Sequence, residues 1–89
     1  MFNSRTPDGK RNLCGAKVKA LRKRRGRGFS QRLLAEEMQK QSIDIDKNAI
    51  QRIESGERYV NDFELMKLCE LFGVTAEELC GLTDNDKES

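Results

Sequence analysis

Apolar residues recur along this chain at the three- and four-residue spacing of amphipathic helices. The pattern predicts five helices, over Leu13–Arg24, Gln31–Lys40, Lys47–Ser55, Asp62–Phe72 and Ala76–Cys80. Glycines follow the first, third and fourth of these segments, where a left-handed residue commonly closes a helix. The only alternating run, Ile43-Asp44-Ile45, is too short to predict a strand. The pattern therefore indicates an all-α protein.

Four of the predicted helix starts share one local device, a polar capping residue between two apolar residues that can pack together as a hydrophobic staple. The capping residues are Ser30, Asp46, Asn61 and Thr75, and the apolar pairs are Phe29 with Leu34, Ile45 with Ile50, Val60 with Leu65 and Val74 with Leu79. Glu64 and Glu78 also stand where a capping box needs a glutamate. Each cap satisfies otherwise unbonded amides and contributes roughly 1 kcal/mol.

The helical spacing also selects a core, because residues three and four apart share one face of a helix. The predicted core residues are Cys14, Val18, Leu21, Leu34, Ala35, Met38, Ile50, Ile53, Leu65, Leu68, Cys69, Phe72, Leu79 and Leu82. None of these positions indicates a cofactor pocket, and we expect no cofactor.

The 89 residues suit a single small domain, predicted over residues 12–82. Residues 1–11 are polar, contain Pro7 and Gly9, and are predicted to form a flexible basic arm; residues 83–89 form a polar tail. No stretch approaches the roughly 18 apolar residues of a membrane span, and the N-terminus has no signal-peptide core, so we expect a cytoplasmic protein.

The three cysteines, Cys14, Cys69 and Cys80, are far apart in sequence, and the chain has no histidine. A zinc site would need closely spaced ligand pairs. We therefore interpret the cysteines as small apolar packing residues and expect no metal. Catalysis is also disfavoured, because the chain lacks a phosphate-binding glycine loop and an isolated pair of acids in a pocket.

Positive charge is concentrated near the N-terminus. Residues 1–32 contain 11 basic residues and one acidic residue, a net charge of +10, whereas the other 6 basic and 14 acidic residues give −8. A basic segment of this kind favours a polyanionic partner such as nucleic acid. The alternative is a solvated helix face next to a disordered tail.

The predicted helix Lys47–Ser55 has an unusual outer face. At about 100° per residue, Ala49, Ile50 and Ile53 share one side. The opposite side carries Lys47, Asn48, Gln51, Arg52 and Ser55, with no acid among them. Asn and Gln can pair with adenine through two hydrogen bonds, and Lys or Arg with guanine. This face is therefore a candidate surface for contacting DNA bases, although a polar helix face is usually only solvated.

Motifs over nearly the whole predicted domain resemble the Cro/cI-type, lambda-repressor-like helix-turn-helix family. They are Arg22, Phe29-Ser30-Gln31, Leu34-Ala35, Ile50-Gln51-Arg52-Ile53-Glu54-Ser55-Gly56, Leu65-Met66-Lys67-Leu68, Phe72-Gly73-Val74 and Glu78-Leu79. The resemblance covers roughly residues 13–82. It implies a compact five-helix bundle in which the second and third helices bind double-stranded DNA.

Carried over position by position, the resemblance implies roles for individual residues. Base contacts fall on Lys47, Asn48, Gln51 and Arg52, and phosphate contacts on Ser30, Gln31, Ser55, Arg58 and Tyr59. The free amides and positive dipole end of the second helix agree with a phosphate site there. For Ser30 the alternative is a plain helix cap, and for Arg58 a solvated loop charge.

The resemblance also pairs Arg22 with Glu54 in a salt bridge between the first and third helices. Arg22 lies next to core residue Leu21, and Glu54 borders the apolar face of its helix. A guanidinium can hold a carboxylate through two hydrogen bonds, which fixes angle as well as distance. We expect this pair to clamp the recognition helix to the scaffold.

Two segments depart from the family pattern. Asp46 lies 11 positions after Ala35, where about 6 is common in the family that the chain resembles. We expect the extra residues to lengthen the second helix and to form a loop over Gln41–Ile45. Arg27-Gly28 also looks inserted between the first two helices.

The sequence therefore predicts a DNA-binding transcriptional regulator that acts as a homodimer on an inverted repeat, as helix-turn-helix proteins usually do. Its tail is too short for a separate oligomerisation domain, so a dimer would use the fifth helix or the surface near it. The alternative is a protein-interaction module, such as an antitoxin or adaptor, whose acidic C-terminal half binds a protein.

Overall fold

Helices make up the regular structure of the computed structural model, which describes residues 9–26 and 28–81. The described residues form α1 (Gly15–Arg25), α2 (Gln31–Lys40), α3 (Lys47–Ser55), α4 (Asp62–Phe72) and α5 (Ala76–Leu79), and they contain no strand. The all-α fold class is thus confirmed. The bounds of α2, α3 and α4 are those predicted from the sequence.

The helix starts are fixed by the predicted caps. The side chains of Ser30, Asp46, Asn61 and Thr75 each accept a hydrogen bond from a backbone N–H in the first turn of the helix that follows. Both predicted capping boxes, Asn61 with Glu64 and Thr75 with Glu78, are present. Four of the five starts therefore follow from local sequence chemistry.

The prediction for the first helix is wrong at its start. Helix α1 begins at Gly15 rather than Leu13. The reason is Asn12, whose Oδ1 accepts hydrogen bonds from the N–H groups of Cys14 and Gly15, so that the helix begins after it. At the other end of the domain, α5 stops at Leu79 and Cys80 lies in a turn. Predicted core residue Leu82 lies outside the described residues.

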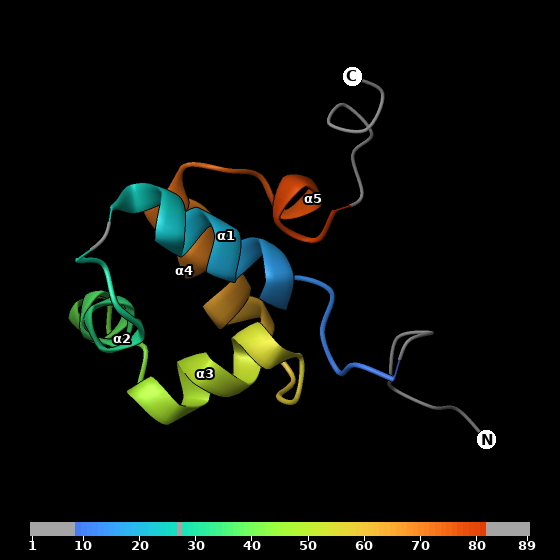
Figure 1. Ribbon diagram of the computed structural model, residues 1–89, viewed down its shortest axis with the longest axis horizontal. Coiled ribbons are helices and arrows are strands. Elements are labelled where there is room, and N and C mark those ends of the chain that lie inside the picture. The colour runs from blue at the N-terminus through green and yellow to red at the C-terminus, as the bar shows by residue number, and fades with distance from the viewer. Residues whose placement is uncertain (1–8, 27, 82–89) are drawn as a thin grey trace.

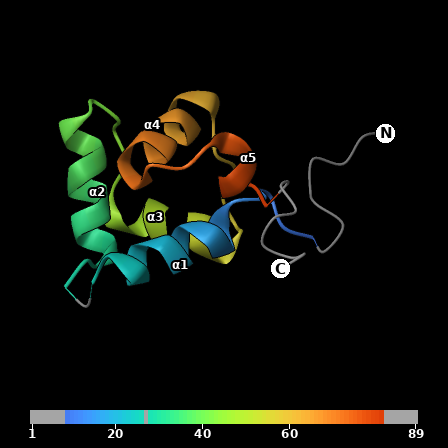
Figure 2. The ribbon, with the colours of Figure 1, turned by 90° about the horizontal axis from the view of Figure 1, so that it is seen from above.

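Helix α3 lies against both α1 and α2. In Figure 1, α1 runs across the front of the molecule, α4 lies behind it and α3 runs along the lower edge. Figure 2 shows α2 crosswise to α1 at one end, and α5 beside α4. This arrangement leaves one long side of α3 outside the bundle.

The core lies between these helices. Its buried apolar residues are Cys14, Val18, Leu21, Leu34, Ala35, Met38, Ile45, Ala49, Ile50, Ile53, Leu68 and Leu79. Leu65, Cys69 and Phe72 were predicted in the core but are only partly buried around it. All three belong to α4, which forms the outer layer of this small bundle, so their side chains have solvent on one side.

Helices α1 and α3 meet backbone to backbone at Gly15. A methyl group on this glycine would collide with the carbonyl oxygen of Ile53. Because Gly15 has no side chain, the first turn of α1 can rest directly on the last turns of α3. The position of α3 relative to α1 is therefore set by backbone contact as well as by side-chain packing.

The long connection between α2 and α3 is an ordered loop, as the sequence predicted. Ser42 takes a left-handed conformation (φ 68°). The N–H groups of Ser42 and Ile43 then bond back to the carbonyls of Gln39 and Met38, in the pattern of a Schellman helix end. The side chain of Gln39 also donates to the carbonyl of Ile45 (2.8 Å). These hydrogen bonds fix the path of the loop from the end of α2 toward the Asp46 cap of α3.

Candidate nucleic-acid interface

The outer side of α3 is polar and exposed along its whole length. Ala49, Ile50 and Ile53 point into the core, whereas the side chains of Lys47, Asn48, Gln51, Arg52 and Ser55 are exposed. Four of these residues, with Glu57 from the following loop, line a pocket of about 350 Å³: Asn48, Gln51, Arg52 and Ser55. The helix thus presents amide and guanidinium donors over a shallow hollow.

One side of α3 is held by a buried ion pair, which we term the inner joint. Arg22 donates from Nε to Glu54 Oε2 (2.6 Å) and from Nη2 to Glu54 Oε1 (3.0 Å). The two side chains are only 11% and 3% exposed. Arg22 also donates to the carbonyl of Phe29 (3.1 Å), and Gln31 donates to Glu54 Oε1 (3.0 Å). The ion pair expected between α1 and α3 is therefore present, and it also ties in the start of α2.

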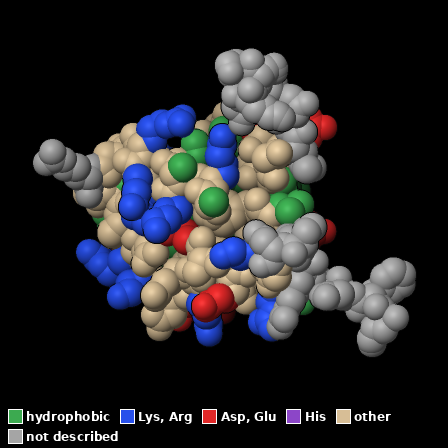
Figure 3. Space-filling model, turned by 45° about the vertical axis from the view of Figure 1, so that its right-hand side comes forward, with side chains coloured by type: hydrophobic (Ala, Val, Ile, Leu, Met, Phe, Trp, Pro, Cys, Tyr) green, Lys and Arg blue, Asp and Glu red, His purple; other side chains and the backbone are tan. Residues whose placement is uncertain are grey.

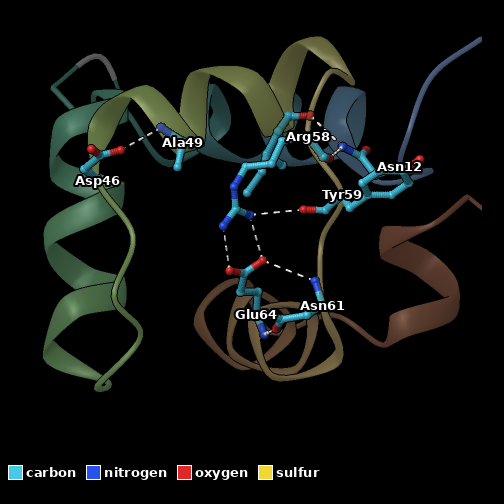
Figure 4. A network of polar contacts seen from close by, with 8 residues as sticks. Asn12, Asp46, Ala49, Arg58, Tyr59, Asn61 and Glu64 are labelled. Atoms are coloured by element: carbon cyan, nitrogen blue, oxygen red, sulfur yellow. Dashed lines mark hydrogen bonds and ion pairs between the residues drawn. The ribbon is translucent and has the colours of Figure 1, made fainter.

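A second ion pair, which we term the outer joint, links the loop after α3 to α4 (Figure 4). Arg58 Nη1 and Nη2 donate to Glu64 Oε1 and Oε2, at 2.8 and 3.0 Å. The side chain of Glu64 is 7% exposed and that of Arg58 30%. The hydrogen bond to Glu64 raises the pKa of Arg58, so this arginine stays charged. Glu64 also accepts from the N–H of Asn61, which places the pair on the cap of α4.

Asn12 joins the outer joint to the start of α1 (Figure 4). Its Nδ2 donates to the carbonyls of Ile53 (3.1 Å) and Arg58 (2.7 Å), while its Oδ1 caps α1. One amide side chain therefore satisfies backbone groups of α1, α3 and the loop after α3. Carbonyls near a helix C-terminus lack intrahelical partners, so this contact stabilises the last turn of α3.

Basic side chains are numerous on the surface of the molecule. Figure 3 shows several separate patches of Lys and Arg side chains on one face of the molecule, and fewer of Asp and Glu. On α1 the exposed residues Lys19, Lys23 and Arg24 belong to the segment with the predicted charge of +10. Such a surface attracts a polyanion by its summed field.

The cysteines contribute to packing. Cys14 is buried in the core, and Cys69 and Cys80 are half-buried around it, all three as free thiols. Burial raises the pKa of Cys14 to about 12 and also raises the pKa of Cys69 and Cys80. Thiols with raised pKa values stay protonated at neutral pH and react slowly.

Two features are absent from the described residues. Over residues 9–26 and 28–81, no cluster of His, Cys, Asp and Glu is arranged to hold a metal ion. Within the same ranges, no helix has the length and apolar character needed to cross a membrane.

A family model described as helix-turn-helix matches residues 18–79, which span most of α1 and continue to the end of α5. The chain belongs to the Cro/cI-type helix-turn-helix family. Membership of this family indicates that the protein binds DNA. Neither a curated protein nor a solved structure matches the chain.

In this helix-turn-helix domain the structure gathers the predicted base-contacting residues on one exposed face of α3. Ser30 and Gln31 lie at the N-terminus of α2, Ser55 is the last residue of α3, and Tyr59 lies in the loop that follows. The hydroxyl of Ser30 accepts from Leu33 N–H, which leaves its own hydrogen to donate. The contacts of these residues with DNA remain predictions.

Two residues of the helix-turn-helix domain were missed by the sequence analysis. Asn12 was not assigned a role, because its partners are 41 and 46 positions away in the chain. Glu57 was not considered at the interface, yet it lines the same pocket as Gln51 and Arg52. The available signal for Glu57 was its place directly after Gly56, the glycine that closes α3.

Proposed function

We propose that this protein is a sequence-specific, double-stranded DNA-binding regulator of transcription. The observation that carries the proposal is the exposed face of α3, where Lys47, Asn48, Gln51 and Arg52 project from a helix clamped on its other side by the inner joint. Side chains of these types distinguish base pairs in the major groove. A clamped helix holds them in one register.

In this proposal, the N-terminus of α2 contacts a phosphate of the DNA backbone. The first N–H groups of a helix lack intrahelical partners, and its dipole end is positive, so a phosphate can bind there. Ser30 can add its hydroxyl hydrogen. Because Gln31 donates to Glu54, the same residue that begins α2 also touches the clamp of α3. A phosphate at this end would therefore be bound at a fixed distance from the base-contacting residues.

For the dimer expected on an inverted repeat, we propose a contact through α4. The helix exposes two large apolar side chains one turn apart, Phe63 at 70% and Met66 at 56%. In α5, by contrast, the described exposed positions are Ala76 and Glu77. Neighbouring exposed apolar groups commonly mark an interaction surface. We expect Phe63→Glu to shift a dimer to monomer in sedimentation velocity and to reduce cooperative binding to two half-sites.

A protein-interaction module is the second candidate. The acidic balance of the C-terminal part and the exposed apolar side chains of α4 favour it, because both suit a protein partner. The two candidates differ in which surface is essential. In a regulator, substitutions on α3 abolish activity, whereas in an antitoxin or adaptor, substitutions on α4 do so while α3 tolerates change.

Selection of bound fragments from random duplex DNA tests the proposed function. We expect one preferred sequence, arranged as two half-sites about one helical turn apart. Asn48→Ala and Gln51→Ala should each cost roughly 1–3 kcal/mol on that site and much less on random DNA. Lys40→Ala, at the far end of α2, is the matched control and should leave specificity unchanged. No enriched sequence, together with no binding at low salt, would exclude the proposed function.

A further inference from the structure

Resting on the proposed function, we propose that Lys10 and Arg11 form a phosphate-binding edge at the C-terminal end of α3. They would supply the positive charge that the sequence analysis assigned to Arg58. We term these two residues the strap. They belong to the predicted flexible arm, yet they contact the domain, so its contacts begin at least two residues before the predicted boundary.

Arg58 is poorly placed for a phosphate because its guanidinium is already engaged. It donates two hydrogen bonds to Glu64 and a third to the carbonyl of Tyr59. A phosphate would have to compete with a carboxylate that is 7% exposed and would be repelled by it. The arrangement therefore makes Arg58 a positioning residue for the loop after α3.

The strap lies across the end of α3 (Figure 1). The N–H of Arg11 donates to the carbonyl of Gly56 (2.8 Å), and Lys10 Nζ donates to the carbonyl of Ser55 (3.2 Å). The side chain of Lys10 covers Gly56 so closely that a Cβ there would collide with it. The positive charge of Lys10 thus sits beside Ser55, and that of Arg11 sits beside Tyr59, two residues that the sequence predicted to contact phosphate.

Arg11 retains hydrogen-bonding capacity in this position. A guanidinium has five N–H donors, and in the described structure one of the two Nη atoms of Arg11 donates to the carbonyl of Glu57 (3.3 Å). The guanidinium carbon lies 5.7 Å from the centre of the Tyr59 ring, a cation–π distance, and Tyr59 is 52% exposed. The arginine is therefore held beside a hydroxyl that can donate to the same phosphate.

The end of α3 requires such cations if DNA is to approach it. The C-terminal end of a helix carries a partial negative charge, and the exposed carboxylate of Glu57 adds a full one. Both would repel a DNA backbone. Lys10 and Arg11 offset this repulsion at the place where the sugar–phosphate chain would pass the predicted contacts Ser55 and Tyr59.

The salt dependence of DNA binding tests the strap. The slope of log K against log salt changes by about 0.9 for each phosphate that the protein no longer neutralises. We expect Arg11→Gln to reduce the slope by about 0.9, and Lys10→Gln with Arg11→Gln by about 1.8. Arg11→Lys should retain the slope because the charge stays. Arg58→Gln and the control Lys40→Gln should leave the slope unchanged.

The slope distinguishes a phosphate contact from a structural role. If Arg11 only stabilised the end of α3, its removal would weaken binding at every salt concentration with an unchanged slope, and this would overturn the proposal. A slope change in Arg58→Gln with none in Arg11→Gln would overturn it as well. Absent binding of the unmodified protein at low salt would instead reject the proposed function, and the strap with it.

Discussion

The inner and outer joints use the same chemistry, an arginine–glutamate pair with two hydrogen bonds, but they are buried to different depths. In the inner joint both side chains are buried, and Glu54 receives a third hydrogen bond from Gln31. In the outer joint the carboxylate of Glu64 is buried, whereas almost a third of the Arg58 side chain is exposed. The inner joint links three helices, and the outer joint links a loop to one helix cap.

This difference in depth decides what happens when one partner is removed. A charge stranded in a dry site has no water to replace its partner, whereas a half-exposed arginine can turn toward solvent. Removal of either partner of the inner joint should therefore lower the free energy of unfolding strongly. The outer joint should be asymmetric, because removal of Arg58 strands a buried carboxylate, while removal of Glu64 leaves an arginine that can be hydrated.

The largest expected effect is at the inner joint. Glu54→Ala should lower the free energy of unfolding by about 3–5 kcal/mol, because it strands the desolvated Arg22. Urea denaturation followed by circular dichroism measures this decrease. Glu57→Ala, three positions further along and exposed, is the control and should stay within about 0.5 kcal/mol. A decrease below about 1 kcal/mol for Glu54→Ala would mean that the pair behaves like an exposed one.

At the outer joint, Arg58→Ala should cost about 2 kcal/mol, because a buried carboxylate is deprived of its hydrogen bonds. Glu64→Ala should cost only about 1 kcal/mol, since Arg58 can then be hydrated. The same denaturation experiment compares the two variants. If Arg58→Ala and Glu64→Ala lower the free energy of unfolding equally, or if Glu64→Ala lowers it as much as Glu54→Ala, then the burial of each side chain does not determine the effect of its removal.

Variants of Asn12 separate its two functions, the capping of α1 and the hydrogen bonds to the carbonyls of Ile53 and Arg58. Asn12→Asp keeps the oxygen that caps α1 but removes the amide donor that reaches Ile53 and Arg58, and it should cost roughly 1 kcal/mol. Asn12→Ala removes both functions and should cost roughly 1 kcal/mol more. Thermal melting of the two variants measures the difference. Identical melting temperatures would mean that only the bonds to α3 matter.

A change outside both joints should have the smallest effect. Ser42 holds a left-handed conformation in the loop before α3, and Ser42→Gly should raise the free energy of unfolding by about 0.5 kcal/mol, because glycine adopts this conformation without steric cost. DNA affinity should not change, since both joints stay intact. A parallel rise in affinity would show that the loop, rather than the joints, limits the placement of α3.

The local parts of this fold could be predicted from the sequence. The caps at Ser30, Asp46, Asn61 and Thr75 depend on residues at most three positions away, so the helix starts could be found without knowing the packing. Helix α1 also has a local cap, but the residue before it is Arg11, so the apolar pair of a hydrophobic staple is missing. Its start is set by Asn12, and an asparagine two positions before the predicted core residue Cys14 gives no distinctive pattern.

The distant contacts could be predicted only where a resemblance supplied them. Arg22 and Glu54 are 32 positions apart, and their pairing was implied by the family pattern rather than by periodicity. The partner of Arg58 is six positions away across a loop and a helix cap, a spacing that no periodic rule covers. Its predicted phosphate contact was carried over from the family resemblance, and the engagement of its guanidinium by Glu64 became visible only in the structure.

The contact at Gly15 has a consequence for the DNA itself. Because the backbones of α1 and α3 touch there, α3 has no soft layer of side chains through which it could tilt or slide. Under the proposed function, any misfit between protein and groove must then be absorbed by the duplex. Operators with pliable pyrimidine–purine steps near the site would bend into register at a lower energetic cost than stiff A-tracts. The rigid contact between α1 and α3 would thus make the protein prefer certain base pairs that none of its side chains touches.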